Sequence, residues 1–124
     1  MKQILNVGMN PHTVDLTTPE FPPGLTVEKV LQGIEFGKQK LSESGIDLNI
    51  CFIDSGSLDI TAFIEQLKSK PFEGVVIGAG VRLPPPNFLL FEKLVNAVHE
   101  HAPNAKIIFN TNPNDTAEAI KRWL

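Results

Sequence analysis

The stretch Gly74–Pro86 reads GVVIGAGVRLPPP, and it indicates which fold class the chain belongs to. Its first six residues are almost wholly apolar, which is typical of a strand buried on both faces in the middle of a parallel sheet. Two glycines, Gly78 and Gly80, then predict a turn, and Arg82 follows them. The three prolines that end the stretch predict a stiff polyproline II segment, so we expect the next helix to begin only at about Asn87.

Runs of the same strand character occur at three other places, and each of the four is followed by a segment of helical period. This alternation predicts an α/β domain with right-handed connections and helices on both faces of a parallel sheet. With the third strand in the centre, we expect a small doubly wound four-stranded parallel sheet of order 2-1-3-4. The expected strands are 3–9, 47–54, 74–79 and 105–111, and the expected helices are 26–45, 59–70, 87–102 and 115–124.

Several residues indicate where these helices begin and end. Thr26 and Asn87 are expected N-caps, and Gly45 is expected to end the first helix in a left-handed conformation. Asp115 and Glu118 have the spacing of a capping box for the last helix.

Length and composition indicate one ordinary globular domain, residues 1–124. The net charge of −3 favours neither nucleic acid nor a membrane surface as a partner. Cys51 is the only cysteine, so no internal disulfide can form, and its apolar surroundings predict a buried thiol. The first residues do not have the pattern of a signal peptide, and no segment has the length of a membrane span, so we expect a cytoplasmic protein.

Three short motifs resemble known families. VVIGAG (75–80) resembles the first strand of FAD- and NAD-binding Rossmann enzymes, but Leu83 stands where the third glycine of their fingerprint would be. FIDSGS (52–57) resembles the active-site loop of aspartic proteases, but a helical period follows it. The order of elements is similar to that of response-regulator receiver domains, with Asn10 and Gly78 in place of their acidic residues. As a whole the chain resembles small uncharacterised bacterial α/β proteins of flavodoxin-like or Rossmann-like type, which implies a fold and no particular activity.

In an open parallel sheet, ligands bind beyond the carboxyl ends of the strands, where the connections leave to opposite faces. Here that crevice lies between the first and third strands. A glycine turn can offer a nest of N–H groups to an anion, an arginine adds a fork of donors, and a histidine can donate or exchange a proton. We therefore expect the crevice to bind a small molecule that carries a phosphate or a carboxylate. The candidate residues are Asn10, His12, Gly78, Ala79, Gly80, Arg82, Asn110 and Asn112.

A second hypothesis is a receiver-like protein–protein interaction module that takes no ligand. It predicts a filled crevice and an exposed apolar patch around Phe88, Leu89 and Leu90. The sequence identifies no cofactor and no catalytic pair, and it does not decide whether the protein is an enzyme. No metal site is expected, because His99 and His101 point to different sides of their helix.

Two further features bear on partners. The loop 10–24 has about fifteen residues where two to six are usual, and it is interpreted as a lid, a packed rim or a dimer arm. A small sheet with two free edges also suits a homodimer.

Overall fold

Four apolar segments form the strands of one sheet in the computed structural model, which describes all residues, 1–124. They are β1 (Lys2–Met9), β2 (Ile46–Ile53), β3 (Gly74–Ile77) and β4 (Lys106–Phe109). All neighbours are parallel, and their order is β2-β1-β3-β4. The predicted fold class and strand order are therefore confirmed. Each strand lies within two residues of its expected bounds.

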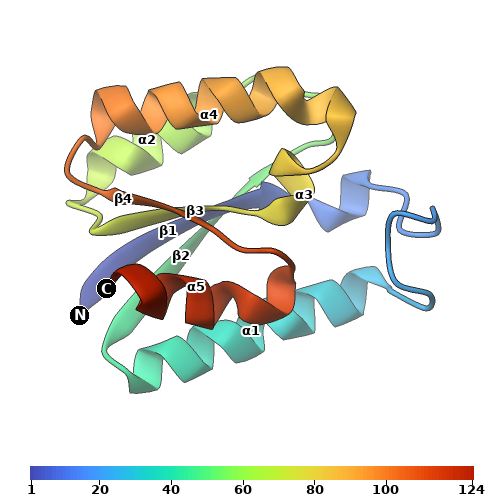
Figure 1. Ribbon diagram of the computed structural model, residues 1–124, viewed down its shortest axis with the longest axis horizontal. Helices are drawn as coiled ribbons and strands as arrows, with labels where there is room; N and C mark the ends of the chain where they lie inside the picture. The colour runs from blue at the N-terminus through green and yellow to red at the C-terminus, as the bar shows by residue number, and fades with distance from the viewer.

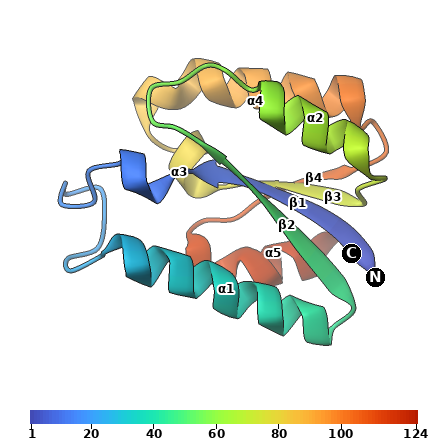
Figure 2. The same ribbon diagram turned by 180° about the vertical axis from the view of Figure 1, so that it is seen from behind.

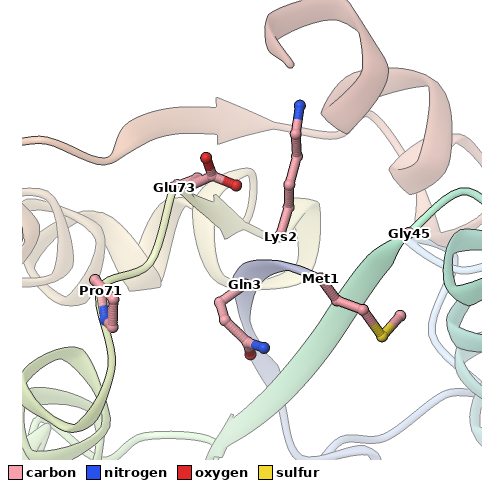
Figure 3. A pocket seen from close by; sticks show the side chains of 6 residues that line it. All are labelled: Met1, Lys2, Gln3, Gly45, Pro71 and Glu73. Atoms are coloured by element: carbon pink, nitrogen blue, oxygen red, sulfur yellow. The ribbon is translucent and has the colours of Figure 1, made fainter.

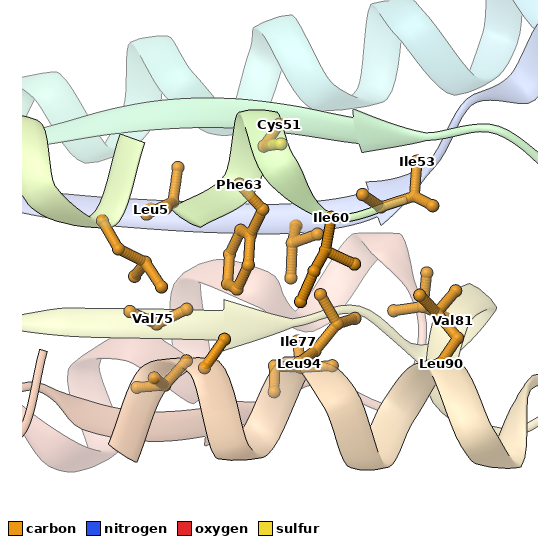
Figure 4. Close-up of a cluster of buried hydrophobic side chains, with 14 of the residues drawn as sticks. Leu5, Cys51, Ile53, Ile60, Phe63, Val75, Ile77, Val81, Leu90 and Leu94 are labelled. Atoms are coloured by element: carbon orange, nitrogen blue, oxygen red, sulfur yellow. The ribbon is translucent and has the colours of Figure 1, made fainter. Parts of the chain in front are cut away.

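Helices cover both faces of the sheet (Figures 1 and 2). α2 (Thr61–Ser69) and α4 (Phe88–His101) lie on one face, and α1 (Val27–Glu43) and α5 (Thr116–Trp123) lie on the other. Fifteen buried residues form the core between the sheet and the α2/α4 layer, and Figure 4 shows Phe63 and Leu94 among the strand side chains there. The core under α1 and α5 has eight residues. The two layers thus differ in how much apolar surface they bury.

Of the four predicted helix ends, those at Thr26 and Gly45 are confirmed and the capping box of the last helix is wrong. Asn87 is the N-cap residue of α4, but its side chain makes no capping hydrogen bond. The Thr26 hydroxyl accepts a hydrogen bond from the N–H of Lys29, and Gly45 has a φ of +79°. Asp115, however, pairs with Asn112 and not with Glu118: these two form the capping box of a short 3-10 turn, η3 (Pro113–Asp115). The reason is Pro113. The first residue of a helical turn needs no partner for its N–H, so a proline fits there, and Pro113 starts η3 directly before α5.

The segment after β3 differs from the prediction. A short helix, α3 (Ala79–Arg82), begins as soon as the strand has ended, and a 3-10 turn, η2 (Pro85–Asn87), leads into α4. Only Pro84 has the extended backbone of polyproline II, with φ −61° and ψ 124°. The fixed φ of proline suits the first residues of a helical turn as well as polyproline II, which explains why the prolines allow η2.

Candidate functional site

The expected crevice between the ends of β1 and β3 is occupied by the first turn of α3. Gly78 donates its N–H to the Val7 carbonyl at 2.9 Å, and a Cβ on Gly78 would lie 3.2 Å from that same oxygen. A Cβ on Gly80 would lie 3.8 Å from the Cβ of Met9. Neither glycine has a positive φ. The N–H groups of Gly78 and Ala79 are both taken up within the chain, and Gly78 serves the close approach of α3 to β1.

Asn110 joins β4 to two other segments at this end of the sheet. It is only 5% exposed. Its Oδ1 accepts the N–H of Ala79 at 2.8 Å, and its Nδ2 donates to the Thr116 hydroxyl at 2.9 Å. Its main-chain oxygen accepts from Nη2 of Arg82 at 2.5 Å. All the polar groups of the Asn110 side chain are thus engaged within the chain.

Arg82 lies over β4 and not over the crevice. Its Cζ atom is 5.1 Å from the centre of the Phe109 ring, a cation–π distance. The ring of Phe109 also meets that of Phe91 edge to face, with the centroids 5.8 Å apart. The Nε atom of Arg82 is buried and has no hydrogen-bond partner. Phe109 was not among the expected site residues, because nothing in the sequence of an apolar strand indicates that an arginine will stack on one of its rings.

The other polar candidates lie elsewhere along the same edge. Asn10 donates from Nδ2 to Asp54 Oδ1 at 3.0 Å and accepts from the N–H of His12 at 3.1 Å, so it ties β1 to the end of β2. His12 is exposed in a 3-10 turn, η1 (Pro11–Thr13). Asn112 accepts from the N–H of Asn114 at 2.8 Å. Hydrogen bonds thus join Ala79, Arg82 and Asn110, with Gly78 and Gly80 beside Ala79 in the chain, and none of these bonds includes Asn10, His12 or Asn112.

The long connection after η1 extends outward from the carboxyl end of the sheet (Figures 1 and 2). We call residues 14–25 the arm. Its hydrogen bonds are local: Asp15 accepts from Thr17, Phe21 donates to Thr18, and the only bond to a helix is from Lys29 Nζ to the Gly24 carbonyl. The arm is thus held at its two ends, by η1 and by α1.

The structure moves the pKa of four ionisable groups. Hydrogen bonds from Thr17 lower the pKa of Asp15, and hydrogen bonds from Thr61 lower that of Asp59. The other two groups are Asp115 and Cys51. Partial burial acts to raise the pKa of Asp115, but hydrogen bonds from Thr111 and Asn112 and the charge of Arg122 outweigh it and hold the pKa below its ordinary value. Burial raises the pKa of the Cys51 thiol, which agrees with the expected buried and unreactive cysteine.

Two surface recesses lie away from the expected site. One of about 610 Å³ is at the opposite, amino-terminal edge of the sheet (Figure 3). Lys2 and Gln3 point to opposite sides there, as neighbours on a strand must, so the polar groups do not converge. The other, of about 250 Å³, lies between α2 and α4. The first recess is lined by Met1, Lys2, Gln3, Gly45, Pro71 and Glu73, which come from separate parts of the chain and share no sequence signal.

Large apolar side chains are exposed at the start of α4. Leu83 is 59% exposed, Phe88 68% and Leu89 51%. Leu90, which was expected in the same patch, is only 2% exposed and packs in the core, because it lies on the inner side of α4. We call Leu83, Phe88 and Leu89 the α4 apolar surface.

No protein-family model, no curated protein and no solved structure matches this chain. The structure holds no group of three or more His, Cys, Asp or Glu side chains that could hold a metal ion. None of its helices combines the length and the apolar character that crossing a membrane requires.

Proposed function

We propose that this chain is a protein-interaction domain that contacts a protein partner through the α4 apolar surface. The observation that carries the proposal is that Leu83, Phe88 and Leu89, three large apolar side chains within seven residues, are each more than half exposed. Exposed apolar side chains that gather in one part of the surface are a usual feature of protein contact sites. The segment that bears it is held by η2 and by a hydrogen bond from Asn87 Nδ2 to the Gly80 carbonyl, 3.0 Å long.

The filled crevice supports the same function. A ligand at the switch point needs free donors, whereas the Ala79 N–H, the Asn110 side chain and Nη2 of Arg82 are engaged with one another or with neighbouring segments. The large side chains that stay exposed beside this end of the sheet, Leu83, Phe88 and Leu89, are apolar. Apolar groups favour contact with a protein surface over contact with a small anion.

The test compares two phenylalanines that are equally exposed. Phe88 and Phe36 are both 68% exposed, but Phe36 lies on α1, far along the chain from the α4 apolar surface. The wild type, Phe88→Ser and Phe36→Ser are each immobilised and exposed to an extract of the cells that express the protein, and the bound proteins are quantified by mass spectrometry. We expect at least one protein to be held by the wild type and by Phe36→Ser but lost from Phe88→Ser. If no bound protein distinguishes the two variants, the proposed function is wrong.

A small anionic ligand is a second candidate, and the buried Nε of Arg82, which has no hydrogen-bond partner, is the observation that favours it. Thermal unfolding of the wild type and Arg82→Ala is measured with phosphate, sulfate, NAD, NADP, FMN, CoA and sugar phosphates. A ligand at about 100 times its Kd adds about 2.7 kcal/mol to the free energy of unfolding. A stabilisation that Arg82→Ala abolishes would favour this function, and the absence of any shift in the wild type would rule it out for these ligands.

A further inference from the structure

The two edge strands of the sheet differ in how well they are protected. β4 has four residues, begins with Lys106, and has its Phe109 carbonyl occupied by Nη2 of Arg122 at 3.1 Å. Short length and positive charge are the usual means by which proteins prevent an edge from pairing. β2 has eight residues, IDLNICFI, with neither lysine, arginine nor proline among them. β2 is therefore an open edge, whereas β4 is a closed one.

The outward-facing groups of β2 can be assigned from its hydrogen bonds to β1. The Gly45 and Ile53 carbonyls accept from Lys2 and Asn10, so the odd-numbered residues of this strand face β1. In a parallel pair the N–H and C=O groups of one residue point to the same side, and the side alternates along the strand. The main-chain groups of Ile46, Leu48, Ile50 and Phe52 therefore face the free edge.

We propose that β2 pairs antiparallel with β2 of a second copy of this chain, about a two-fold axis at Ile50. This inference is independent of the function proposed above. In this register Ile50 faces its own copy and Leu48 faces Phe52. Residues that stand opposite each other in an antiparallel pair lie on the same face of the sheet and interact. The pairing thus places three apolar pairs in a row on the α1 side, where Ile46 and Leu48 already pack.

A second copy fits this edge because the pattern of β2 is complementary to itself. Phe52 is 39% exposed although it is a large apolar residue in a strand, and in the proposed pair it packs against Leu48 of the second copy. No two like charges stand directly opposite: Asp47 faces Ile53 and Asp54 faces Ile46. A two-fold contact must use the same patch on both copies, and the three apolar residues Leu48, Ile50 and Phe52, which are symmetric about Ile50, meet that condition.

The experiment uses the whole chain and a matched pair of edge variants. Phe52 on β2 and Phe109 on β4 are 39% and 38% exposed, so Phe52→Lys and Phe109→Lys make the same change on the two edges. Mass is measured by light scattering from about 1 μM to about 500 μM protein. We expect the wild type to reach twice its chain mass of 13.6 kDa as concentration rises. Phe52→Lys should raise the dimer Kd at least tenfold, and Phe109→Lys should leave it within about twofold.

Hydrogen exchange in the wild type gives a second measurement that needs no variant. The amides of Leu48 and Ile50 should exchange more slowly at high protein concentration than at low concentration, whereas those of Ile107 and Phe109 should not change. The proposal is overturned if the wild type stays monomeric throughout the range. It is also overturned if a dimer forms without concentration-dependent protection of Leu48 and Ile50, or if Phe109→Lys dissociates it and Phe52→Lys does not.

Discussion

Asn110 uses its amide to hold two segments that begin beside it. Its Oδ1 accepts the first free N–H of α3, and its Nδ2 donates to the hydroxyl that follows η3. A helix leaves its first N–H groups without partners inside the helix, and a buried one needs a partner elsewhere. The Asn110 side chain, at the end of β4, therefore supplies an acceptor for the N–H of Ala79, which the start of α3 would otherwise leave unpaired.

Replacing the Asn110 side chain should lower the free energy of unfolding by more than the lost side-chain volume alone would. In Asn110→Ala the N–H of Ala79 loses its partner, a side chain that is only 5% exposed, whereas the Thr116 hydroxyl keeps its bond to the Pro113 carbonyl. We expect the free energy of unfolding to fall by about 1–3 kcal/mol, as is usual when a buried donor is left unpaired. Urea unfolding measures it. Asn114→Ala, at an exposed asparagine one turn away, should change stability by less than about 0.5 kcal/mol, and equal effects of the two would contradict the role given to Asn110.

Asp115 should make the stability depend on pH at the acid end. Its pKa in the folded state lies below its value in the unfolded chain, so its contribution to stability is present above the unfolded pKa of about 3.9 and is lost as the pH falls further. In urea unfolding at pH values from about 5 down to about 2, we expect the wild type to lose more stability than Asp115→Asn. Parallel losses in the two proteins would mean that the carboxylate is not responsible.

At the scale of elements, α3 depends on one close backbone contact with β1. Only 3.2 Å separate the place of a Cβ on Gly78 from the Val7 oxygen, whereas a Cβ on Gly8 would meet nothing within 4 Å. A contact with backbone is costly to relieve because the strand itself must move.

These two glycines make a matched pair for mutation. Gly78→Ala should lower the free energy of unfolding by about 1–3 kcal/mol because α3 must shift away from β1. Gly8→Ala should leave it unchanged or raise it by up to about 1 kcal/mol, since the unfolded chain loses freedom and the folded one has room. Thermal unfolding of both variants measures this. The packing assigned to α3 is wrong if Gly78→Ala is as stable as the wild type.

The elements that the sequence predicted well are those in which periodicity depends on burial. GVVI is apolar at every position because both faces of β3 are covered, and all four of its residues are buried. The segment 78–88 was predicted poorly because glycine and proline permit more than one backbone conformation, and tertiary contacts decide between them. The same applies to the site: spacing indicated that Arg82 and Asn110 would lie at one end of the sheet, but not that they would bond to each other.

At the scale of the whole molecule, a few general rules predict the order of the strands, but they do not predict the course of the loops. Parallel strands, right-handed connections and a central β3 leave few arrangements, and the order β2-β1-β3-β4 was among them. The course of the arm follows no such rule, because its prolines and local turns fix its stiffness and not its direction.

The arm also divides the covalent chain at an unusual place. β1 has hydrogen-bonded neighbours on both sides, β2 along eight residues and β3 along four, and the arm lies in the covalent connection from β1 to the elements that follow it. A cut in the arm would therefore break the covalent connection between β1 and the later elements, while β1 would stay hydrogen-bonded between β2 and β3 in the sheet. The domain is thus assembled like a split protein, in which a short peptide completes a larger fragment.

Glutamyl endopeptidase provides the means, because Glu20 is exposed in the arm. We expect early cleavage after Glu20, and we expect the fragments 1–20 and 21–124 to elute together from a sizing column under native conditions and to separate in denaturant. Glu20→Gln should resist the early cut. Release of the short fragment without denaturant would show that continuity of the chain, and not the sheet, retains β1. If the fragments stay together, a synthetic 1–20 peptide added to the longer fragment should restore the fold by complementation.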